Sequence, residues 1–599
     1  MATTPAEQVM VRGGAFLISA VKPGEIFTPA DLNDDQRLIG RTTEEFLAKE
    51  VIPHTAEIEQ HKEGLMAALV KKAGEIGLLG AGIPEEYGGA ALDKISSTVL
   101  SEKLGVYPSY MVAFGAQTGI GAIPIIYFGT DAQKKKYLPK IATGEWLSCY
   151  ALSESQSGSD ALAVRTRATL SADGKHWILN GQKMWISSGG FSDLFIVFAK
   201  VDGEKFSAFI VERGAPGFSL GAEENKMGIR GSSTVPLFFE NAHVPSENLL
   251  HEIGRGHLVA FNTLNAGRFS LGASCIGGAK HALALSAKYA KERTAFGKAL
   301  CEFGLIQEKL GEMAIRTYAL ESMVYRTAGT IEAAVTSQGS ARVKQLMQVL
   351  EEYSIESSIA KVFGSEMLDY CVDEAVQIFG GYGFHEDYPV ARMYRDSRIN
   401  RIFEGTNEIN RLVIIQMLLK RAMGGVLPLI PAAMKLGEEL LGGPSLEEPA
   451  AGILAEEDRS VERAKKIFLL AAGTAVQKFR DQLANEQEIV GALANIVIDV
   501  YAMESAVRRA QKAATGGGEA AGGTAPMADA ARVFVYDAMD RVEKEARRAL
   551  SATADGDALA TQLAALRRLA KHAPLDTVAL RRRVAAAVLV QDRYPFDGR

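Results

Sequence analysis

The stretch His176-Trp-Ile-Leu-Asn-Gly-Gln-Lys-Met-Trp-Ile-Ser187 marks the change of pattern that decides the fold. It contains two short runs of β-forming residues joined by Asn180-Gly181. An Asn-Gly dipeptide favours the type I′ turn of a β-hairpin, so we predict two strands here. Segments 194–200, 206–212 and 235–240 predict further strands separated by turn residues. Residues 147–258 are therefore predicted to form a small β domain.

Helical patterns lie on both sides of this region. Residues 34–52 and 65–79 carry apolar side chains at helical spacing. Long helical patterns return after Val259, and glycine and proline are scarce between Leu305 and Phe379, which predicts a bundle of long helices. The order helices, strands, helices predicts separate layers rather than alternating βαβ units, and it disfavours a nucleotide-binding Rossmann unit.

Beyond Gly424 the composition shifts again. Two Gly/Pro-rich stretches are predicted linkers, and segments 458–485, 488–513 and 527–590 have helical composition. The glycine-rich run 516–526 is predicted to be mobile. We therefore expect a mainly α protein with a central β domain. Its expected parts are an N-terminal arm (1–30), an N-terminal α domain (31–146), a middle β domain (147–258), an α-helical bundle domain (259–423) and a C-terminal helical domain (424–599).

The overall composition excludes several classes of protein. With a net charge of -6 the chain has no basic excess, and we find no nucleic-acid motif. The four cysteines form no CxxC pair, so neither a disulfide framework nor a metal site is expected. We find no signal peptide and no window with the ~20 apolar residues of a transmembrane helix. The expected location is cytoplasmic in a bacterium or mitochondrial in a eukaryote.

Three polar segments are candidates for binding. The loop Tyr150–Asp160 is rich in small and hydroxyl residues, so it could offer N–H and hydroxyl groups to a ligand or be a plain surface turn. In segment 183–190, Trp185 could stack on a flat cofactor or fill the sheet core. In segment 291–298, Arg293 could bind a pyrophosphate or be a solvated charge at a helix end.

The fourth segment, 377–411, contains a candidate general base. Glu404 follows the apolar Phe403 and precedes a helix for which Thr406 is the predicted N-cap. The alternative is an acidic residue that only complements the helix dipole. Burial would raise the pKa of Glu404 and the helix start would lower it, and the sequence leaves the balance open.

Together, and in this order, the four segments resemble the acyl-CoA dehydrogenase family over about residues 30–422. The runs FEGTNEINRL (403–412), LNAGRFSLGA (264–273) and FGLIQEKL (303–310), with the added domain after residue 424, are most similar to the very-long-chain branch and its relative that assists respiratory complex assembly. The resemblance implies an N-terminal α domain, a middle β domain and a four-helix bundle, with FAD between them.

The resemblance also implies roles for individual residues. Glu404 matches the catalytic base, and other branches place that base just before the arginine that is Arg268 here, where this chain has Gly267. The implied FAD contacts are Tyr150, Leu152, Ser153, Ser159, Trp185, Ile186, Ser187, Arg293, Phe296, Gln377, Gly380, Gly381, Thr406 and Glu408. The implied substrate contacts are Ser159, Asn265, Arg268 and Gly405. Arg293, Phe296, Gln377, Gly380 and Gly381 match positions that reach the FAD of a neighbouring subunit.

The implied reaction is the α,β-dehydrogenation of an acyl-CoA to a trans-2-enoyl-CoA in fatty acid β-oxidation. Glu404 would take the α-proton while the β-hydride passes to flavin N5. The sequence departs from the family pattern at Glu154-Ser155, where Glu-Pro is usual, at Ser153, a common threonine, and at Ala295, a common polar residue. None of these removes an expected catalytic group.

The resemblance further implies an electron-transferring flavoprotein as electron acceptor and a homodimer. Small residues at Gly115, Ala116, Gly119 and Gly121 would leave room for a long acyl chain or allow close helix packing. Basic stretches of the C-terminal domain could contact a membrane or be a solvated helix face. Two alternative functions remain at this stage: an acyl-CoA oxidase that uses O2, and a non-enzymatic assembly or scaffold role through residues 424–599.

Overall fold

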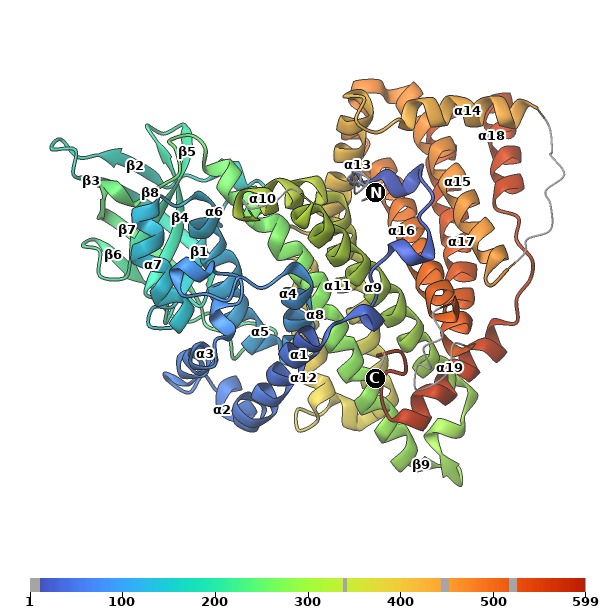
Figure 1. Cartoon of the computed structure of the whole chain (residues 1–599), viewed down its shortest axis with the longest axis horizontal. Coiled ribbons are helices and arrows are strands. Elements are labelled where there is room, and N and C mark those ends of the chain that lie inside the picture. Colours follow the sequence, from blue (N-terminus) through green and yellow to red (C-terminus); the bar gives the residue numbers. More distant parts are fainter. Residues whose placement is uncertain (1–10, 338–341, 443–451, 516–524, 598–599) are drawn as a thin grey trace, which may run out of the picture.

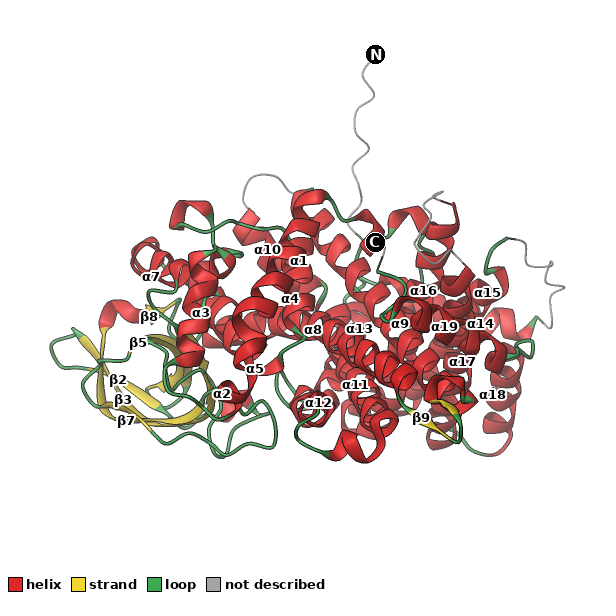
Figure 2. Ribbon diagram, turned by 90° about the horizontal axis from the view of Figure 1, so that it is seen from below, coloured by secondary structure: helices red, strands yellow, loops and turns green. Residues whose placement is uncertain are grey.

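The computed structural model describes residues 11–337, 342–442, 452–515 and 525–597. Figure 1 shows a β-sheet at one end, a bundle of long helices in the centre and a second helical region at the other end. Figure 2 confirms that, within the described residues, the large sheet is confined to one end. The predicted fold class, mainly α with a central β domain, is confirmed.

The N-terminal region packs short helices against one side of the sheet and the bundle. They are α1 (Asp34–Phe46), α2 (Thr55–Glu59), α3 (Leu65–Glu75), α4 (Lys94–Leu104), α5 (Pro108–Gly115), α6 (Ile123–Phe128) and α7 (Asp131–Thr143). A π-helical turn, Ala116–Gly121, joins α5 to α6. Single π turns inside helices are rare and occur often at functional sites.

The middle region is a single twisted sheet. Its strands are β1 (Ser148–Ala151), β2 (Arg167–Leu170), β3 (His176–Ser187), β4 (Leu194–Val201), β5 (Lys205–Glu212), β6 (Phe218–Leu220), β7 (Thr234–Pro245) and β8 (Leu249–Leu250). The order is β6-β7-β3-β2-β4-β5-β8, and β1 pairs in parallel with β4. Nearly all residues of β4 and β5 are buried, because helices or other strands cover both faces at this point.

The predicted hairpin at Asn180-Gly181 is wrong. Strand β3 runs straight through the dipeptide, and both halves pair with β7, with a register shift between Leu179 and Gly181. Gly181 has φ +146, and a Cβ there would lie 2.6 Å from Thr166 Oγ1. The side-chain Oδ1 of Asn180 accepts the backbone N–H of Asn241 on β7 at 2.8 Å. The dipeptide therefore marks a β-bulge, which is the other role of glycine within a strand.

The central bundle is built from α8 (Gly256–Glu292), α9 (Gly304–Thr336), α10 (Arg342–Glu352), α11 (Ser354–Phe379), α12 (Pro389–Ser397) and α13 (Asn407–Met423). A small hairpin, β9 (Thr294–Ala295) and β10 (Lys298–Ala299), caps the connection from α8 to α9. Helices α8 and α11 pack side by side over much of their length. This pair carries most of the residues around the candidate site.

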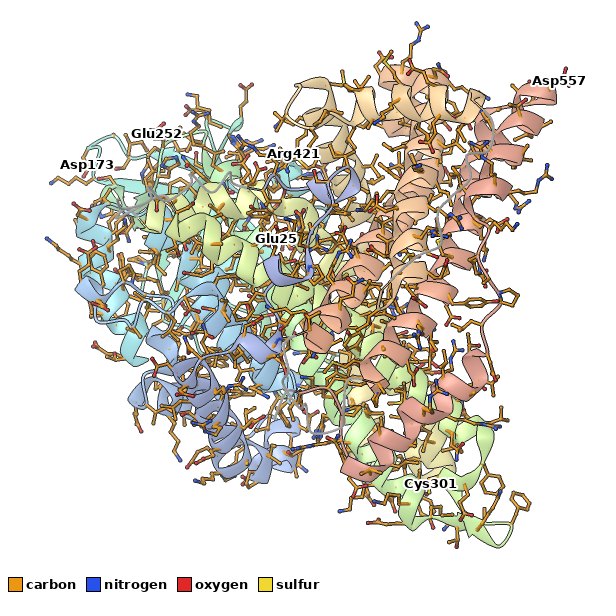
Figure 3. The ribbon with its side chains drawn as sticks, turned by 45° about the vertical axis from the view of Figure 1, so that its right-hand side comes forward. Glu25, Asp173, Glu252, Cys301, Arg421 and Asp557 are labelled. Atoms are coloured by element: carbon orange, nitrogen blue, oxygen red, sulfur yellow. The ribbon has the colours of Figure 1, made fainter. Side chains whose placement is uncertain are left out.

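The C-terminal region adds α14 (Leu429–Leu441), α15 (Ala455–Phe479), α16 (Gln487–Thr515), α17 (Ala525–Thr553), α18 (Gly556–Leu569) and α19 (Thr577–Gln591). Helix α16 packs on α9 and α13, so this region shares one core with the bundle. The N-terminal segment also ties the two together, because Arg421 donates to the carbonyl of Gly13 and Lys512 pairs with Asp31 at 2.6 Å. Figure 3 labels Arg421 and Glu25 on this face.

Several arginines that were candidates for membrane contact have partners within the chain. Arg581 pairs with Glu312 and Asp537, and Arg583 pairs with Asp529. Arg547 and Arg548 pair with Glu543 and Glu545 on their own helix. These contacts account for four of the arginines in the basic stretches. The glycine-rich run that was predicted to be mobile lies almost entirely outside the described residues.

Two stretches, 108–128 and 487–515, are long and apolar enough to cross a membrane by length and composition alone, although the sequence search found none. In the second, 89% of the apolar window is buried inside the protein. Core helices of globular proteins pass the same test, and α16 packs against α9, α13, α15 and α17. Burial within the fold therefore explains its apolar composition.

Candidate active site

The centre of the site is a strained turn before α13. Glu404 has φ +57 and Gly405 has φ +78, so two consecutive residues adopt the left-handed conformation. Such a conformation is costly for a glutamate, and it persists only where the surroundings enforce it. The hydroxyl of Thr406 accepts the N–H of Ile409 at 3.3 Å, which confirms Thr406 as the N-cap of α13.

Three side chains donate hydrogen bonds to the carbonyls of this turn. Arg268 Nε on α8 donates to the Glu404 carbonyl at 3.2 Å. Lys361 Nζ on α11 donates to the Gly405 carbonyl at 2.8 Å, and so does Asn410 Nδ2 on α13. Donors from three helices thus hold the turn.

The carboxyl group of Glu404 occupies space that Gly267 leaves open. A Cβ at Gly267 would lie 2.6 Å from Glu404 Oε2 and 2.7 Å from its Cδ. A larger residue at 267 would force this carboxyl to move from its present position. Glu404 Oε2 is buried and has no hydrogen-bond partner among the described residues. An unpaired buried carboxylate oxygen is costly and is typical of a functional group.

The electrostatic environment suits a proton acceptor. Burial raises the pKa of Glu404 to about 7, while the nearby charges of Arg268 and Lys361 lower it. Burial is the largest of these influences, which answers the question that the sequence left open. A carboxyl group with a pKa near neutrality is a better base than an exposed one, and about half of it is ionised at pH 7.

The first two polar segments meet beside this turn. Lys183 Nζ donates to the Leu152 carbonyl at 3.1 Å and to Glu154 Oε1 at 2.7 Å, and Met184 N–H donates to the Ser153 carbonyl at 2.9 Å. Lys183 and Glu154 are both buried. This ion pair fixes the loop after β1 against β3. The Glu404 charge contributes to raising the pKa of Tyr150 on β1, so these two side chains are neighbours.

The candidate contacts on these segments differ in exposure. Trp185 has φ +62 and is 58% exposed, because a second irregularity of β3, between Lys183 and Ile186, turns its side chain outward. The alternative that Trp185 fills the core of the sheet is therefore wrong. Ile186 is buried and Ser187 is half-buried. Tyr150 and Leu152 are buried, Ser153 is half-buried and Ser159 is exposed.

The candidate substrate contacts lie closer to the turn. Asn265 and Arg268 are buried, and Arg268 Nη1 donates to Asn265 Oδ1 at 3.0 Å. Gly405 belongs to the turn itself, and Glu408 lies in the first turn of α13. Of the residues suggested by sequence, the structure thus groups Tyr150, Asn265, Arg268, Glu404 and Gly405 in one place.

The third segment does not join this group. Phe296 lies on the β9–β10 hairpin with its side chain 96% exposed, and Arg293 stacks on Tyr382 at 5.6 Å. Three residues of the fourth segment are also outside the group: Gln377, Gly380 and Gly381 are exposed at the end of α11. In Figure 3, Cys301 marks this end of the molecule, and Asp173 and Glu252 mark the β domain at the other. Along α8, Arg268 and Arg293 are separated by about 37 Å.

Three residues of the site carried no sequence signal that identified them. Lys361 and Lys183 are buried lysines within apolar runs, and Asn410 lies in the helix after the base. A lysine in the middle of the apolar run SIAKVFG (358–364) is unusual for a core helix, and this was the one sign that Lys361 has a special role. The role of Lys361 depends on the turn that it contacts, which lies 44 residues later in the chain.

Comparisons with known proteins agree with this architecture. Acyl-CoA dehydrogenase family models match residues 33–145 (N-terminal domain), 149–242 (middle domain), 254–419 (C-terminal domain) and 463–568 (a further C-terminal domain model). A protein of Bacillus subtilis named "Probable acyl-CoA dehydrogenase" is 49% identical over 97% of this chain and 98% of its own length. The mitochondrial very long-chain specific acyl-CoA dehydrogenase of Bos taurus is 37% identical over 82% of this chain and 77% of its own length.

A solved structure extends the similarity to three dimensions. The crystal structure of an acyl-CoA dehydrogenase from Bacillus anthracis, complexed with FAD, has a TM-score of 0.95 and 49% identity. The match covers 98% of this chain and 100% of that one, so it includes the added C-terminal helices. With matches to four family models and a relative of this identity over nearly the whole length, this chain belongs to the acyl-CoA dehydrogenase family.

Proposed function

We propose that this protein is an FAD-dependent acyl-CoA dehydrogenase that converts long-chain acyl-CoA to trans-2-enoyl-CoA, with Glu404 as the base. The observation that carries the proposal is the Glu404 carboxyl. It is buried and unpaired at Oε2, it lies on a strained turn, and three donors hold that turn in place. Membership of the family supports the choice of reaction.

The residues of the chain account for the proton transfer. Glu404 accepts the α-proton of the acyl thioester at Oε2, which requires the ionised form of the carboxyl group. Arg268 and Lys361 favour that ionised form, and the apolar acyl chain expels water and strengthens the base. FAD supplies the acceptor for the hydride that leaves the β-carbon.

The residues present fit such a cofactor. The hydroxyls of Tyr150 and Ser188 are buried without a hydrogen-bond partner among the described residues, so both are available to a polar ligand. Trp185, three residues before Ser188, is exposed and has a strained backbone conformation. We propose that Leu152, Ser153, Ser187, Thr406 and Glu408 complete the contacts of the flavin part. The similarity to the FAD complex from Bacillus anthracis supports this assignment.

The proposed function is tested by mixing the flavin-loaded protein with acyl-CoAs of increasing length in the absence of oxygen. Long-chain acyl-CoA should bleach the flavin absorbance, and enoyl-CoA should form in equal amount. If no acyl-CoA bleaches the flavin, the proposal is wrong. Repeating the reaction in air distinguishes an oxidase, which would form peroxide at the rate of turnover. We propose an electron-transferring flavoprotein as the acceptor.

Lys183→Met should weaken flavin binding roughly tenfold, a loss of about 1.4 kcal/mol. The substitution leaves Glu154 buried without its cation and releases the Leu152 carbonyl, so the loop next to the flavin loses its support. Flavin retention during dialysis measures the effect. Adding Glu154→Gln removes the unpaired charge and should recover part of the loss. Equal retention in wild type and Lys183→Met would show that the ion pair does not support the cofactor.

The preference of the enzyme for acyl chain length should depend on the small residues at the α5–α6 junction. A Cβ placed on Gly115 or Gly119 would meet no atom within 4 Å, which favours open space over close packing at these two positions. At Gly121 a Cβ would lie 2.4 Å from Ser148 Oγ, so that glycine serves helix packing. We propose that the open space beside Gly115 and Gly119 receives the far end of a long acyl chain.

Gly115→Leu should therefore lower kcat/KM for a long acyl-CoA by about 100-fold and leave a short acyl-CoA nearly unaffected. Excluding about four methylene groups at ~0.8 kcal/mol each accounts for this magnitude. Gly82→Leu is the matched control, because Gly82 is exposed and also faces open space. A parallel loss for both chain lengths would point to misfolding rather than to a shortened pocket.

We also propose that two copies of the chain form the working unit. Arg293 lies about 37 Å along α8 from Arg268, too far for one FAD to contact both residues in the same chain. Tyr382, which follows Gly380 and Gly381, lies against Arg293, so these glycines belong to the same distant end. The exposure of Phe296 supports a contact with a second copy. Light scattering should then give a mass near twice the 64.3 kDa of one chain. A monomer that retains flavin and activity would contradict this.

A further inference from the structure

Lys361 is a buried lysine directly beneath the turn that carries Glu404. Its side chain is fully buried on α11, where the neighbouring Ala360 and Val362 are also buried. Its Nζ donates to the Gly405 carbonyl at 2.8 Å and to Asn407 Oδ1 at 2.7 Å. One ammonium group therefore joins the strained turn to the first residue of α13.

A charge in this position is expensive. Burying an ammonium costs several kcal/mol, and a well-packed apolar side chain of similar volume is often at least as stabilising. Burial lowers the pKa of Lys361 to about 8, which leaves it mostly charged at neutral pH. Its two acceptors are a carbonyl and an amide oxygen, so neither neutralises it. The presence of a lysine at this position is therefore poorly explained by its contribution to fold stability.

The charged and titratable groups around Lys361 come from two helices and the turn. They are Cys275 and Arg268 on α8, Glu404 on the turn and Glu408 on α13. Glu404 in turn faces Arg268, Lys361 and, from β1, Tyr150. The Glu404 carboxyl has no direct ion-pair contact with either cation within 4 Å, so the ammonium acts on it through space.

The contacts of Asn407 extend this arrangement to the C-terminal region. Asn407 Nδ2 donates to Ser365 Oγ and to Glu366 Oε1, each at 3.0 Å. Glu366 also receives both terminal nitrogens of Arg411, whose Nε donates to Asn495 Oδ1 on α16 at 2.7 Å. Lys361 thus lies at the buried end of a connected polar network, where its position is well determined.

We propose that Lys361 is a positioning residue for Glu404: its ammonium holds the strained turn through the Gly405 carbonyl, and its charge keeps the carboxyl ionised at neutral pH. The proposal rests on the proposed function, in which Glu404 is the base. It assigns to a residue outside the substrate and cofactor contacts the task of setting the pH range in which proton abstraction proceeds.

The test compares flavin-loaded wild type, Lys361→Met and Lys361→Arg across pH 5.5–9.5. Two quantities are measured: the rate of anaerobic bleaching by a long acyl-CoA, and exchange of the α-hydrogen with solvent deuterium in an acyl-CoA analogue that has sulfur at the β-position. The analogue cannot lose a β-hydride, so exchange reports proton abstraction alone. Lys288→Met serves as control, because Lys288 is an exposed lysine on α8.

In Lys361→Met, the pH midpoint of both measurements should rise by roughly one unit or more, because one of the two cations that favour the carboxylate is removed. The rate at pH 7 should fall about tenfold and recover partly at pH 9. Lys361→Arg should keep a midpoint close to that of wild type, and so should the Lys288 variant.

Two results would overturn the proposal while leaving the proposed function intact. One is a pH midpoint of the rate that is unchanged in Lys361→Met. Even if the melting temperature of this variant were lower, Lys361 would then have only a structural role. The other is a midpoint in Lys361→Arg that shifts as far as that of the methionine variant. Failure of wild type to bleach with any acyl-CoA would instead refute the proposed function itself.

Discussion

Glu404→Gln should reduce the rate of flavin bleaching by long-chain acyl-CoA about 10³-fold or more at pH 8. Glutamine keeps the size of the side chain and can occupy the space beside Gly267, but it cannot accept the α-proton. General-base catalysis typically contributes 10²–10⁴-fold, and the uncharged amide removes this contribution. Stopped-flow absorbance measures the rate, and the visible spectrum verifies that the flavin is still bound.

The matched control is Glu438→Gln, an exposed glutamate on α14 that should leave the rate unchanged. In wild type, the rate should fall as pH decreases through about 7, the pKa of Glu404. A rate that is independent of pH between 6 and 8, or a Gln variant with near-normal bleaching, would remove Glu404 from its assigned role.

The same pKa predicts an effect on stability with a definite sign. The folded-state pKa of Glu404 lies above its unfolded value of 4.5, so between these values the native state binds more protons than the unfolded state. This contribution to stability is fully present below about pH 4.5 and is lost as pH rises through about 7. Glu404→Gln, which avoids the buried charge, should therefore melt at a higher temperature than wild type at pH 8, and the difference should vanish toward pH 5.

Local sequence predicted the outline of the fold and the position of the base. Helical spacing and the β-rich middle segment predicted the layers, and the run Phe403–Thr406 before an N-cap predicted the turn that carries Glu404. These features depend on residues close together in sequence. The prediction of a hairpin was wrong because Asn180-Gly181 can form either a hairpin turn or a β-bulge. The choice depends on the contact with Asn241, on a strand far away in sequence.

The supporting residues could not be predicted because their partners are distant in sequence. Lys361 contacts a turn 44 residues later, and Lys183 contacts a loop 29 residues earlier. A buried lysine gives no local sign of which carbonyl or carboxylate it will meet. The role of Gly267 is similar, since only the folded chain places it against the Glu404 carboxyl.

A further lysine, Lys280, whose side chain is 13% exposed, joins three regions of the protein far from the base. Its Nζ contacts Glu102 on α4 at 2.8 Å, Glu321 on α9 at 2.5 Å and Asp597 near the C-terminus at 2.5 Å. Arg509 on α16 contacts Glu321 at 2.6 Å from the other side. These carboxylates lie within 4.8 Å of one another, so they would repel strongly without the ammonium. They raise the pKa of Lys280 well above its usual value, which keeps it charged.

Lys280→Met should destabilise the protein by about 3–5 kcal/mol at pH 7–8, because it leaves buried carboxylates without their shared cation. Thermal unfolding should show a lower melting temperature, and the deficit should shrink as pH falls toward 4.5, where protonation of the carboxyls relieves the repulsion. Lys291→Met is the matched control on the same helix, since its ion pair with Asp592 is exposed and worth less than about 1 kcal/mol. Adding Asp597→Asn to Lys280→Met should restore part of the loss, because one repelling charge disappears. Equal melting temperatures for the Lys280 and Lys291 variants would mean that the three carboxylates do not depend on this lysine, and that other contacts hold the N-terminal, bundle and C-terminal regions together.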